Sequence, residues 1–219
     1  MSGIAVLMTK PYAVIFDVGN VLFDWNLRFL YERLIMDDRA LDAFLRDVLT
    51  PQWHVQHDAG RPFAETSAEL IARHPEHAAL IAALGPRFNE TIRGMLPGME
   101  ALVAELHDAG VPLFAITNFS GEFWRPFRAQ HGAVFDRFQG IVVSGDEGLM
   151  KPDPAIYTLA LERFGLAATD AVFFDDNPAN VAGAAAMGIK ARLFTGAAGV
   201  RETLASMGLV SPLNVGLIF

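Results

Sequence analysis

The chain has 219 residues, a formal net charge of −8 at neutral pH, and a hydrophobic content of 52%. This length and apolar content fit one large domain, or a core domain with a smaller insertion, and they argue against disorder. The sequence contains no cysteine, which excludes disulfides, thiolate catalysis and cysteine-based zinc sites. It also has no lysine- and arginine-rich run, so nucleic acid and anionic membranes are not expected as its main partners.

The two ends of the sequence show no targeting or membrane pattern. Residues 1–8 include a short apolar stretch, but they lack a basic start and a small-residue cleavage site. No run approaches the roughly 18 apolar residues that a spanning helix needs. We therefore expect a soluble, cytoplasmic protein, monomeric or homodimeric. The apolar tail at 215–219 is expected to pack on the core or, alternatively, to form a subunit contact.

The first predicted strand is a short apolar run at 13–17 that ends in Asp17, and a similar run at 171–176 ends in Asp175 and Asp176. Such runs are typical of strands that are buried on both faces of a parallel sheet. Ligands of these sheets bind outside the carboxyl ends of the strands, so the three acids would converge there if the strands are neighbours. Close carboxylates repel one another, and Mg²⁺, which binds carboxylates together with phosphate oxygens, would relieve that repulsion.

The segment that follows, 23–94, is predicted to be a helical insertion without strands. The acidic pair at 37–38 divides its first helical stretch into two helices, and Pro51 is expected to end that stretch. Apolar residues recur at three- and four-residue spacing over 26–50, 63–73 and 76–84.

From Pro97 onward, strands and helices alternate. This alternation requires crossover connections and predicts an α/β fold with a Rossmann-like, doubly wound parallel sheet, which the run at 13–17 completes. The expected domains are therefore a discontinuous core, 1–22 and 95–219, and a helical cap, 23–94. The predicted strands are 111–116, 140–144, 171–174 and 189–194, and the predicted helices are 98–107, 122–130, 152–164 and 178–187.

Four polar sites follow these strands or begin these helices. Placed at one sheet edge, a carboxylate, a hydroxyl, an ammonium and an acidic metal site supply the parts that phosphoryl transfer needs: nucleophile, phosphate clamp, charge neutraliser and metal holder. The sites are Asp17, Thr117 with Asn118, Lys151, and Asp175 and Asp176 with Asn180.

The motifs around these residues are FDVGNVL at 16–22, ITN at 116–118, KPDP at 151–154 and FDDNPAN at 174–180. In order and spacing they resemble the haloacid dehalogenase (HAD) superfamily, whose members are mostly Mg²⁺-dependent phosphatases. The resemblance covers the whole chain, and the segment 23–94 matches the family's C1-type cap. The first and last motifs look most similar to the branch of bacterial sugar-phosphate phosphatases of the glucose-1-phosphate type.

The resemblance implies a role for each matching residue. Asp17 would be the nucleophile that attacks phosphorus and becomes an aspartyl phosphate. Thr117 and the Asn118 amide would hold the phosphoryl oxygens, and Lys151 would pair with Asp17 and the phosphate.

The resemblance also implies a magnesium site. Asp17, Asp176 and the backbone carbonyl of Gly19 would bind Mg²⁺. Asp175 and Asn180 would act behind them, by orienting the metal ligand, the lysine or metal-bound water.

Gly19 is a departure from the family pattern. Most phosphatases of the superfamily have a second aspartate there, as general acid and base, and such a group contributes about 10²–10⁴-fold to the rate. Replacements could be a water on the metal, or His54, His57 or Asp58 of the cap, although both histidines are expected on the surface. The sugar-phosphatase branch shares this glycine by resemblance, so we expect slower turnover or a reliance on activated leaving groups.

The main functional hypothesis is a Mg²⁺-dependent phosphatase acting on a small phosphorylated metabolite. One alternative is a 2-haloacid dehalogenase, although those enzymes have uncharged serines where this sequence has its last acid pair. A catalytically weak relative that binds a phosphorylated ligand is the other alternative. Trp25 and Arg28 could border the substrate, with Arg28 facing a second anionic group or simply lying exposed on a helix.

Overall fold

The structure is a computed structural model that describes residues 12–212. Five parallel strands form its central sheet in the order β5-β4-β1-β6-β7. Phe16, the last residue of β1, pairs with Ala115 of β4 and Phe174 of β6, so the two acid-tipped strands are neighbours and end together. The strands are β1 (Ala13–Phe16), β4 (Leu113–Thr117), β5 (Gly140–Val143), β6 (Ala171–Asp175) and β7 (Lys190–Leu193).

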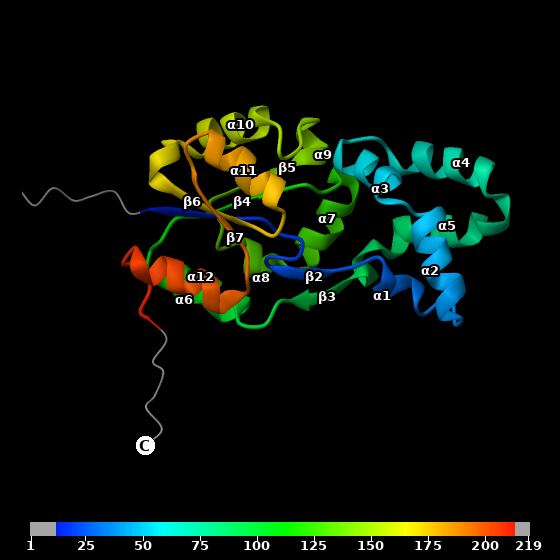
Figure 1. The fold of residues 1–219 in the computed structure, drawn as a ribbon, viewed down its shortest axis with the longest axis horizontal. Coiled ribbons are helices and arrows are strands. Elements are labelled where there is room, and N and C mark those ends of the chain that lie inside the picture. Colours follow the sequence, from blue (N-terminus) through cyan, green and yellow to red (C-terminus); the bar gives the residue numbers. More distant parts are fainter. Residues whose placement is uncertain (1–11, 213–219) are drawn as a thin grey trace, which may run out of the picture.

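Both faces of the sheet are buried, as the doubly wound prediction requires. Along β1, Val14 and Phe16 belong to one apolar cluster, whereas Ala13 and Ile15 belong to another. A strand between two apolar layers gains stability from every side chain, which explains its unbroken apolar sequence. The helices α6 (Met99–Asp108) and α12 (Ala197–Ser206) lie on the Val14 side, and α10 (Pro154–Phe164) and α11 (Pro178–Ala186) lie on the other (Figure 1).

A helical region is inserted between β1 and β4, as predicted, and its helices gather at one end of the molecule (Figure 1). The division at 37–38 is confirmed, because the Asp37 side chain caps the second helix by accepting a hydrogen bond from the Ala40 backbone at 2.8 Å. The inserted helices are α1 (Arg28–Tyr31), α2 (Asp38–Asp47), α3 (Pro51–Asp58), α4 (Phe63–Arg73) and α5 (Ala78–Arg87), with the 3₁₀ turns η1 (Pro75–His77) and η2 (Phe88–Thr91).

The prediction that this segment has no strand is wrong. β2 (Phe23–Trp25) and β3 (Ile92–Met95) form an antiparallel ribbon where the insertion leaves and rejoins the sheet domain. These strands are only three and four residues long, and their register shifts between Phe23 and Trp25. Too few residues share one register for a two-residue alternation to be visible in the sequence.

Pro51 begins a helix and does not end one. It occupies the first turn of α3, where its missing N–H is not needed, and the Thr50 hydroxyl caps the helix by accepting from the Trp53 backbone at 3.2 Å. The helix α12 was not predicted either, since its small residues show only a weak apolar pattern. The remaining helices are α7 (Gly121–Gln130), α8 (Gly132–Phe135) and α9 (Ser144–Glu147), with the 3₁₀ turn η3 (Ala168–Asp170).

The insertion and the sheet domain share one apolar cluster. Phe88 of η2 stacks on Phe123 of α7 with ring centroids 4.3 Å apart, and it meets Phe119 edge-on at 5.3 Å. Ser144 adds a polar link, because its hydroxyl donates to the Asp58 carbonyl at 2.6 Å and accepts from the Phe119 backbone at 2.9 Å. These contacts hold the end of α3 against the sheet edge.

The packing expected for the tail at 215–219 lies outside the described residues. Within 12–212, no helix has both the length and the apolar character needed to cross a membrane.

Candidate active site

Three carboxylates meet at the carboxyl edge of the sheet. Asp17 follows β1 directly, Asp175 is the last residue of β6, and Asp176 is the next residue. One oxygen from each of the three lies within 4.8 Å of the others. The neighbouring strands therefore produce the convergence that their similar sequences predicted.

Lys151 places an ammonium group inside this cluster. Its Nζ lies 2.9 Å from Asp17 Oδ1 and 2.6 Å from Asp175 Oδ2, and its side chain has no exposed area. The lysine backbone is fixed by the side chain of Asn118, which accepts from Lys151 N at 2.9 Å and donates to Lys151 O at 3.0 Å. The Asn118 side-chain amide is thus committed to positioning Lys151. Thr117, the residue before Asn118, is the last residue of β4 and is buried.

Asp175 is fully buried and surrounded by donors. Besides Lys151, it accepts from the Asn177 backbone at 2.8 Å and from Asn180 Nδ2 at 3.0 and 3.2 Å. These donors offset the cost of burying the Asp175 carboxylate. Asp176, by contrast, is exposed, so it is the more accessible of the two acids.

The charges in the cluster are not balanced. Burial raises the pKa of Asp17 to about 7, although the Lys151 charge acts in the opposite direction. Burial also raises the pKa of Asp176, and the charge of Asp175 adds to this effect. Three carboxylates face one ammonium, so a hard divalent cation with oxygen ligands fits this donor set and would favour its ionised form.

A cavity of about 70 Å³ lies beside Gly19. From the sheet domain it is lined by Gly19, Asn118 and Phe119. From the insertion it is lined by Trp25, His54, Asp58 and Phe88. The insertion therefore supplies side chains opposite the position at which the family's second aspartate is missing.

The three cap residues named as replacement acids occupy different places. Asp58 and His54 line the cavity, whereas His57 does not. His57 is completely buried, with Nε2 2.6 Å from the Thr66 hydroxyl and its ring edge-on to Trp53 at 4.6 Å. The predicted surface position of His57 is wrong because its ring is part of the packing between α3 and α4.

Asp58 and His54 differ in their protonation. Burial and, to a smaller extent, the negative charge of Asp17 together raise the pKa of Asp58 to about 7. Burial lowers the pKa of His54 to about 4, so His54 is neutral at pH 7. Of these two, Asp58 is the group that can exchange a proton near neutral pH.

The two residues predicted to border the substrate, Trp25 and Arg28, lie in different places. Trp25 lines the cavity, but Arg28 does not. The Arg28 guanidinium donates instead to Asp42 at 2.6 Å and to Asp38 at 2.9 Å on the outer surface of the insertion. Its position matches the exposed-helix alternative.

Comparison with known proteins identifies the family. Residues 12–188 match the family model described as haloacid dehalogenase-like hydrolase. The chain belongs to the haloacid dehalogenase-like hydrolases.

Two curated relatives of this hydrolase are named phosphatases. It is 29% identical over 193 residues to the sesquiterpene phosphatase astK of Aspergillus oryzae, which covers 84% of this chain and 89% of that protein. It is 34% identical over 158 residues to a phosphoserine phosphatase of Thermus thermophilus, which covers 69% of this chain and 62% of that protein.

Solved structures share its fold. A predicted HAD-like family hydrolase from Porphyromonas gingivalis has a TM-score of 0.69 at 17% identity, covering 91% of this chain and 98% of that chain. A HAD family enzyme from Bacteroides thetaiotaomicron, in complex with magnesium and inorganic phosphate, has a TM-score of 0.66 at 17% identity, covering 86% and 96%. At these identities the similarity establishes the fold, including the inserted helical cap of C1 type.

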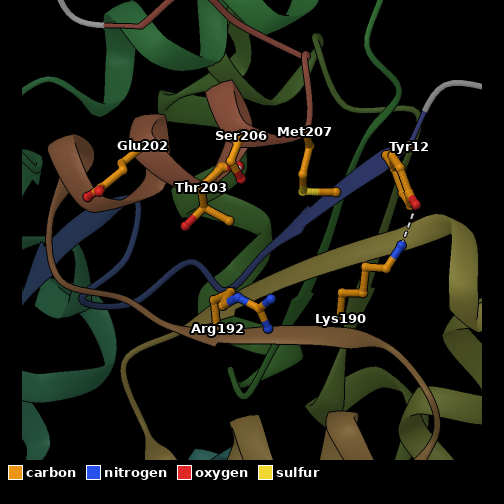
Figure 2. A pocket seen from close by; sticks show the side chains of 7 residues that line it. All are labelled: Tyr12, Lys190, Arg192, Glu202, Thr203, Ser206 and Met207. Carbon is orange, nitrogen blue, oxygen red and sulfur yellow. Dashed lines mark hydrogen bonds between the residues drawn. The ribbon is translucent and has the colours of Figure 1, made fainter.

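The hydrolase has a larger hollow, of about 620 Å³, far from the motifs (Figure 2). Tyr12 and Lys190, which are joined by a hydrogen bond, line it together with Arg192 and residues of α12. Tyr12 precedes β1 and Asp17 follows it, so the hollow and the acid cluster lie at opposite edges of the sheet. None of its lining residues belongs to the four motifs.

From the sequence, Asp58 and His54 could be named, together with His57, only as possible replacements for the missing aspartate. Nothing in the sequence indicated that they face Gly19, because that contact depends on how α3 packs against the sheet domain. Phe119 and Phe123, which pack between the core and the cap, are both buried.

Proposed function

We propose that this protein is a Mg²⁺-dependent phosphatase that acts on a small phosphorylated metabolite. The proposal depends on one observation: the buried Lys151 ammonium bridges Asp17 and Asp175 beside the accessible carboxylate of Asp176. The two relatives named as phosphatases support it, as does the magnesium and phosphate complex of the Bacteroides enzyme. The resemblance of the first motif also makes glucose 1-phosphate a substrate to test.

We propose that Asp17, Asp176 and the backbone carbonyl of Gly19 hold the metal. Bound there, Mg²⁺ would neutralise the charge that the nucleophile and the phosphoryl group bring together. Asp175 is saturated by donors from Lys151, Asn177 and Asn180, so its role is to fix the lysine. Asn180 acts through Asp175 in the same way.

The nucleophile is one oxygen of Asp17. Oδ1 receives the Lys151 ammonium at 2.9 Å and the Val18 backbone N–H at 2.7 Å. In the proposed reaction Oδ2 attacks phosphorus, the bond from phosphorus to the leaving oxygen breaks, and an aspartyl phosphate forms. The Thr117 hydroxyl and the Asn118 backbone N–H would hold the phosphoryl oxygens, since the Asn118 side chain is occupied by Lys151.

Asp58 is the proposed proton-transfer group. It is the carboxyl group that shares the small cavity with Gly19 in the described part of the chain. It would donate a proton to the leaving oxygen and then accept one from the water that hydrolyses the aspartyl phosphate. With this role, the segment 23–94 acts as a cap on a core of 1–22 and 95–219, and its closure completes the site and excludes water.

The variant Asp58→Asn tests this role through the leaving group. Alkyl phosphates need a proton on the departing oxygen, so the substitution should lower their kcat by about 10²–10⁴-fold. 4-Nitrophenyl phosphate releases a stable phenolate, so its rate of Asp17 phosphorylation, measured as the burst in rapid-mixing experiments, should change much less. An equal loss in both substrates would assign Asp58 a structural role instead.

The phosphatase proposal is tested with a panel of aryl phosphate, glucose 1-phosphate and 2-chloropropionate, each with Mg²⁺ and with chelator. We expect phosphate release that requires Mg²⁺ and is abolished by Asp17→Asn. Activity that survives Asp17→Asn would refute the nucleophile. Chloride release in chelator would identify a dehalogenase, and a folded protein inert towards the whole panel would indicate a phosphate-binding role.

A further inference from the structure

A second hollow of about 500 Å³ adjoins the small cavity beside Gly19. The two spaces share Trp25, His54 and Asp58 in their linings. A substrate with its phosphoryl group at Asp17 and its leaving oxygen near Asp58 would therefore extend into the larger hollow, which we call the cap groove. Its volume lies within the range of about 300–1,000 Å³ that is typical of small-molecule sites.

The wall of the cap groove is mainly apolar. Its side chains include Leu27, Leu45, Leu49 and Val55, together with the Trp25 ring. Val55 is 40% exposed, and it is one of three large hydrophobic residues that are exposed in the region 12–212. Because Val55 lines one hollow together with the three leucines and the Trp25 ring, the apolar surface is contiguous, and contiguous apolar surface is what marks a ligand-binding groove.

The cap groove offers little to a polar or charged group. No lysine or arginine of the described residues lines it, and His54 is neutral. Its two asparagines already use their side-chain oxygens: Asn20 accepts from the Trp25 backbone at 3.1 Å, and Asn26 accepts from the Arg28 backbone at 2.9 Å. The other polar groups on its wall are few: Trp25 Nε1 and His54 Nδ1, which have no hydrogen-bond partner among the described residues, and the Asp58 carboxyl. They offer no positive charge to a second anionic group, and they are fewer than the hydroxyls of a sugar, so both would lose more hydration than the groove replaces.

We infer that the cap groove binds the leaving group of the substrate, and that this group is an apolar alcohol. The substrate class is then a monophosphate ester of an alkyl, prenyl or aryl alcohol that has no second charge. This inference rests on the proposed phosphatase function and specifies the substrate of that site. It predicts that sugar phosphates and carboxylate-bearing phosphates are poor substrates.

A series of n-alkyl phosphates from ethyl to decyl tests the inference on the full chain with Mg²⁺. Each methylene that the groove buries should raise kcat/KM by about fourfold until the groove is filled. Glucose 1-phosphate and phosphoglycolate should react no faster than ethyl phosphate. A flat alkyl series, or faster hydrolysis of either polar substrate, would overturn the inference.

A charge placed in the groove gives a matched test. Val55→Lys should flatten the dependence on chain length and raise kcat/KM for phosphoglycolate, because the new ammonium meets its carboxylate. Met36→Lys is the control: Met36 is 90% exposed, belongs to the same insertion and does not line the groove. If both variants behave alike, the groove does not select the leaving group.

Binding measurements separate the failure of this inference from the failure of the proposed function. Alkylphosphonates carry a C–P bond that a phosphatase does not hydrolyse, so calorimetry can follow their Kd without turnover. If the Kd falls with chain length but no ester is hydrolysed, the proposed phosphatase function is rejected and the inference on the cap groove stands. The opposite result is also informative. If ethyl phosphate is hydrolysed and Asp17 is required, but the Kd of the alkylphosphonates does not change with chain length, the phosphatase stands and only the groove inference is rejected.

Discussion

In the proposed reaction, the residue opposite Gly19 would determine how a proton reaches the leaving group. Gly19 itself has no side chain, and Asp58 enters from the insertion to line the same cavity. Asp58 is therefore a carboxyl group that burial keeps partly protonated near neutral pH, and this is the property a general acid needs.

The raised pKa of Asp58 has a cost for folding that depends on pH. Its pKa is about 7 in the folded protein and near 3.8 when unfolded, so the carboxyl ionises more easily in the unfolded chain. The free energy of unfolding therefore decreases as pH rises from about 4 through about 7. Asp58→Asn should raise the Tm of the metal-free protein at pH 8 and leave it unchanged near pH 4.

Asp108→Asn is the control for this experiment, because Asp108 is exposed at the end of α6. Its effect on Tm should differ much less between the two pH values, because burial does not penalise the charge of an exposed carboxylate. If Asp58→Asn raises the Tm by the same amount at pH 4 and at pH 8, the Asp58 carboxyl does not titrate in its buried position as we expect.

Gly19 has room for the aspartate that the family usually places there. A Cβ at this position meets no atom within 4 Å, and its φ lies outside the left-handed region. We expect Gly19→Asp to fold without steric strain, at a cost in the free energy of unfolding that comes from the added negative charge beside Asp17 and Asp58 and is smaller when Mg²⁺ is bound.

Combined with Asp58→Asn, the substitution at Gly19 should restore part of the lost activity towards alkyl phosphates. The measurement is kcat of the double variant against Asp58→Asn alone, and the matched control is Gly19→Asn, which adds a similar volume without an acid. Rescue by both substitutions would show that proton transfer is not what Asp58 supplies.

At the level of elements, β1, β4, β5 and β6 were predictable because each is an apolar run with a clear boundary. The runs of β1 and β6 end in aspartate, and the helix α10 ends at Gly165, which adopts a left-handed conformation with φ 64°. The four motifs could therefore be assigned to the same sheet edge before the structure was known. Their convergence follows from strand order, which the similar sequences of β1 and β6 indicated.

Other elements depend on tertiary contacts that a sequence pattern does not record. The ribbon of β2 and β3 exists because its strands pair with each other across the whole insertion. His57 is buried because Thr66 and Trp53 surround it. The pairing of Asn118 with the Lys151 backbone was also not foreseen, since it joins loops 33 residues apart.

The helix α3 positions Asp58, and its first turn is held by the Thr50 hydroxyl. Thr50→Ala removes this cap and should lower the free energy of unfolding by about 1 kcal/mol, measured by urea denaturation. Thr50→Ser keeps the hydroxyl and should recover most of the loss. If the serine variant is as unstable as the alanine variant, the methyl group of Thr50 and not its hydroxyl is what stabilises α3.

At the scale of the whole molecule, metal binding should stabilise the fold. A ligand at 100 times its Kd adds about 2.7 kcal/mol, which corresponds to a rise in Tm of about 5–10 °C for a chain of this size. We expect Mg²⁺ to produce such a rise in the wild-type protein, and EDTA to reverse it, as followed by differential scanning calorimetry.

Asp176→Asn should abolish that rise without lowering the Tm of the metal-free protein. The Asp176 side chain is exposed and is repelled by Asp175, so its charge does not stabilise the metal-free fold. A normal Mg²⁺ response in this variant would exclude Asp176 as a ligand.

The stacking of Phe88 on Phe123 joins two parts of the chain that protein engineers would want to exchange separately. An insertion transplanted from a relative would bring its own partner for Phe123 and a different surface for Phe119. Without matching rings, the recipient would lose packing where the reactive edge is closed. A chimaera designed to change selectivity should therefore move α7 together with the helical segment, and graft the pair as one unit.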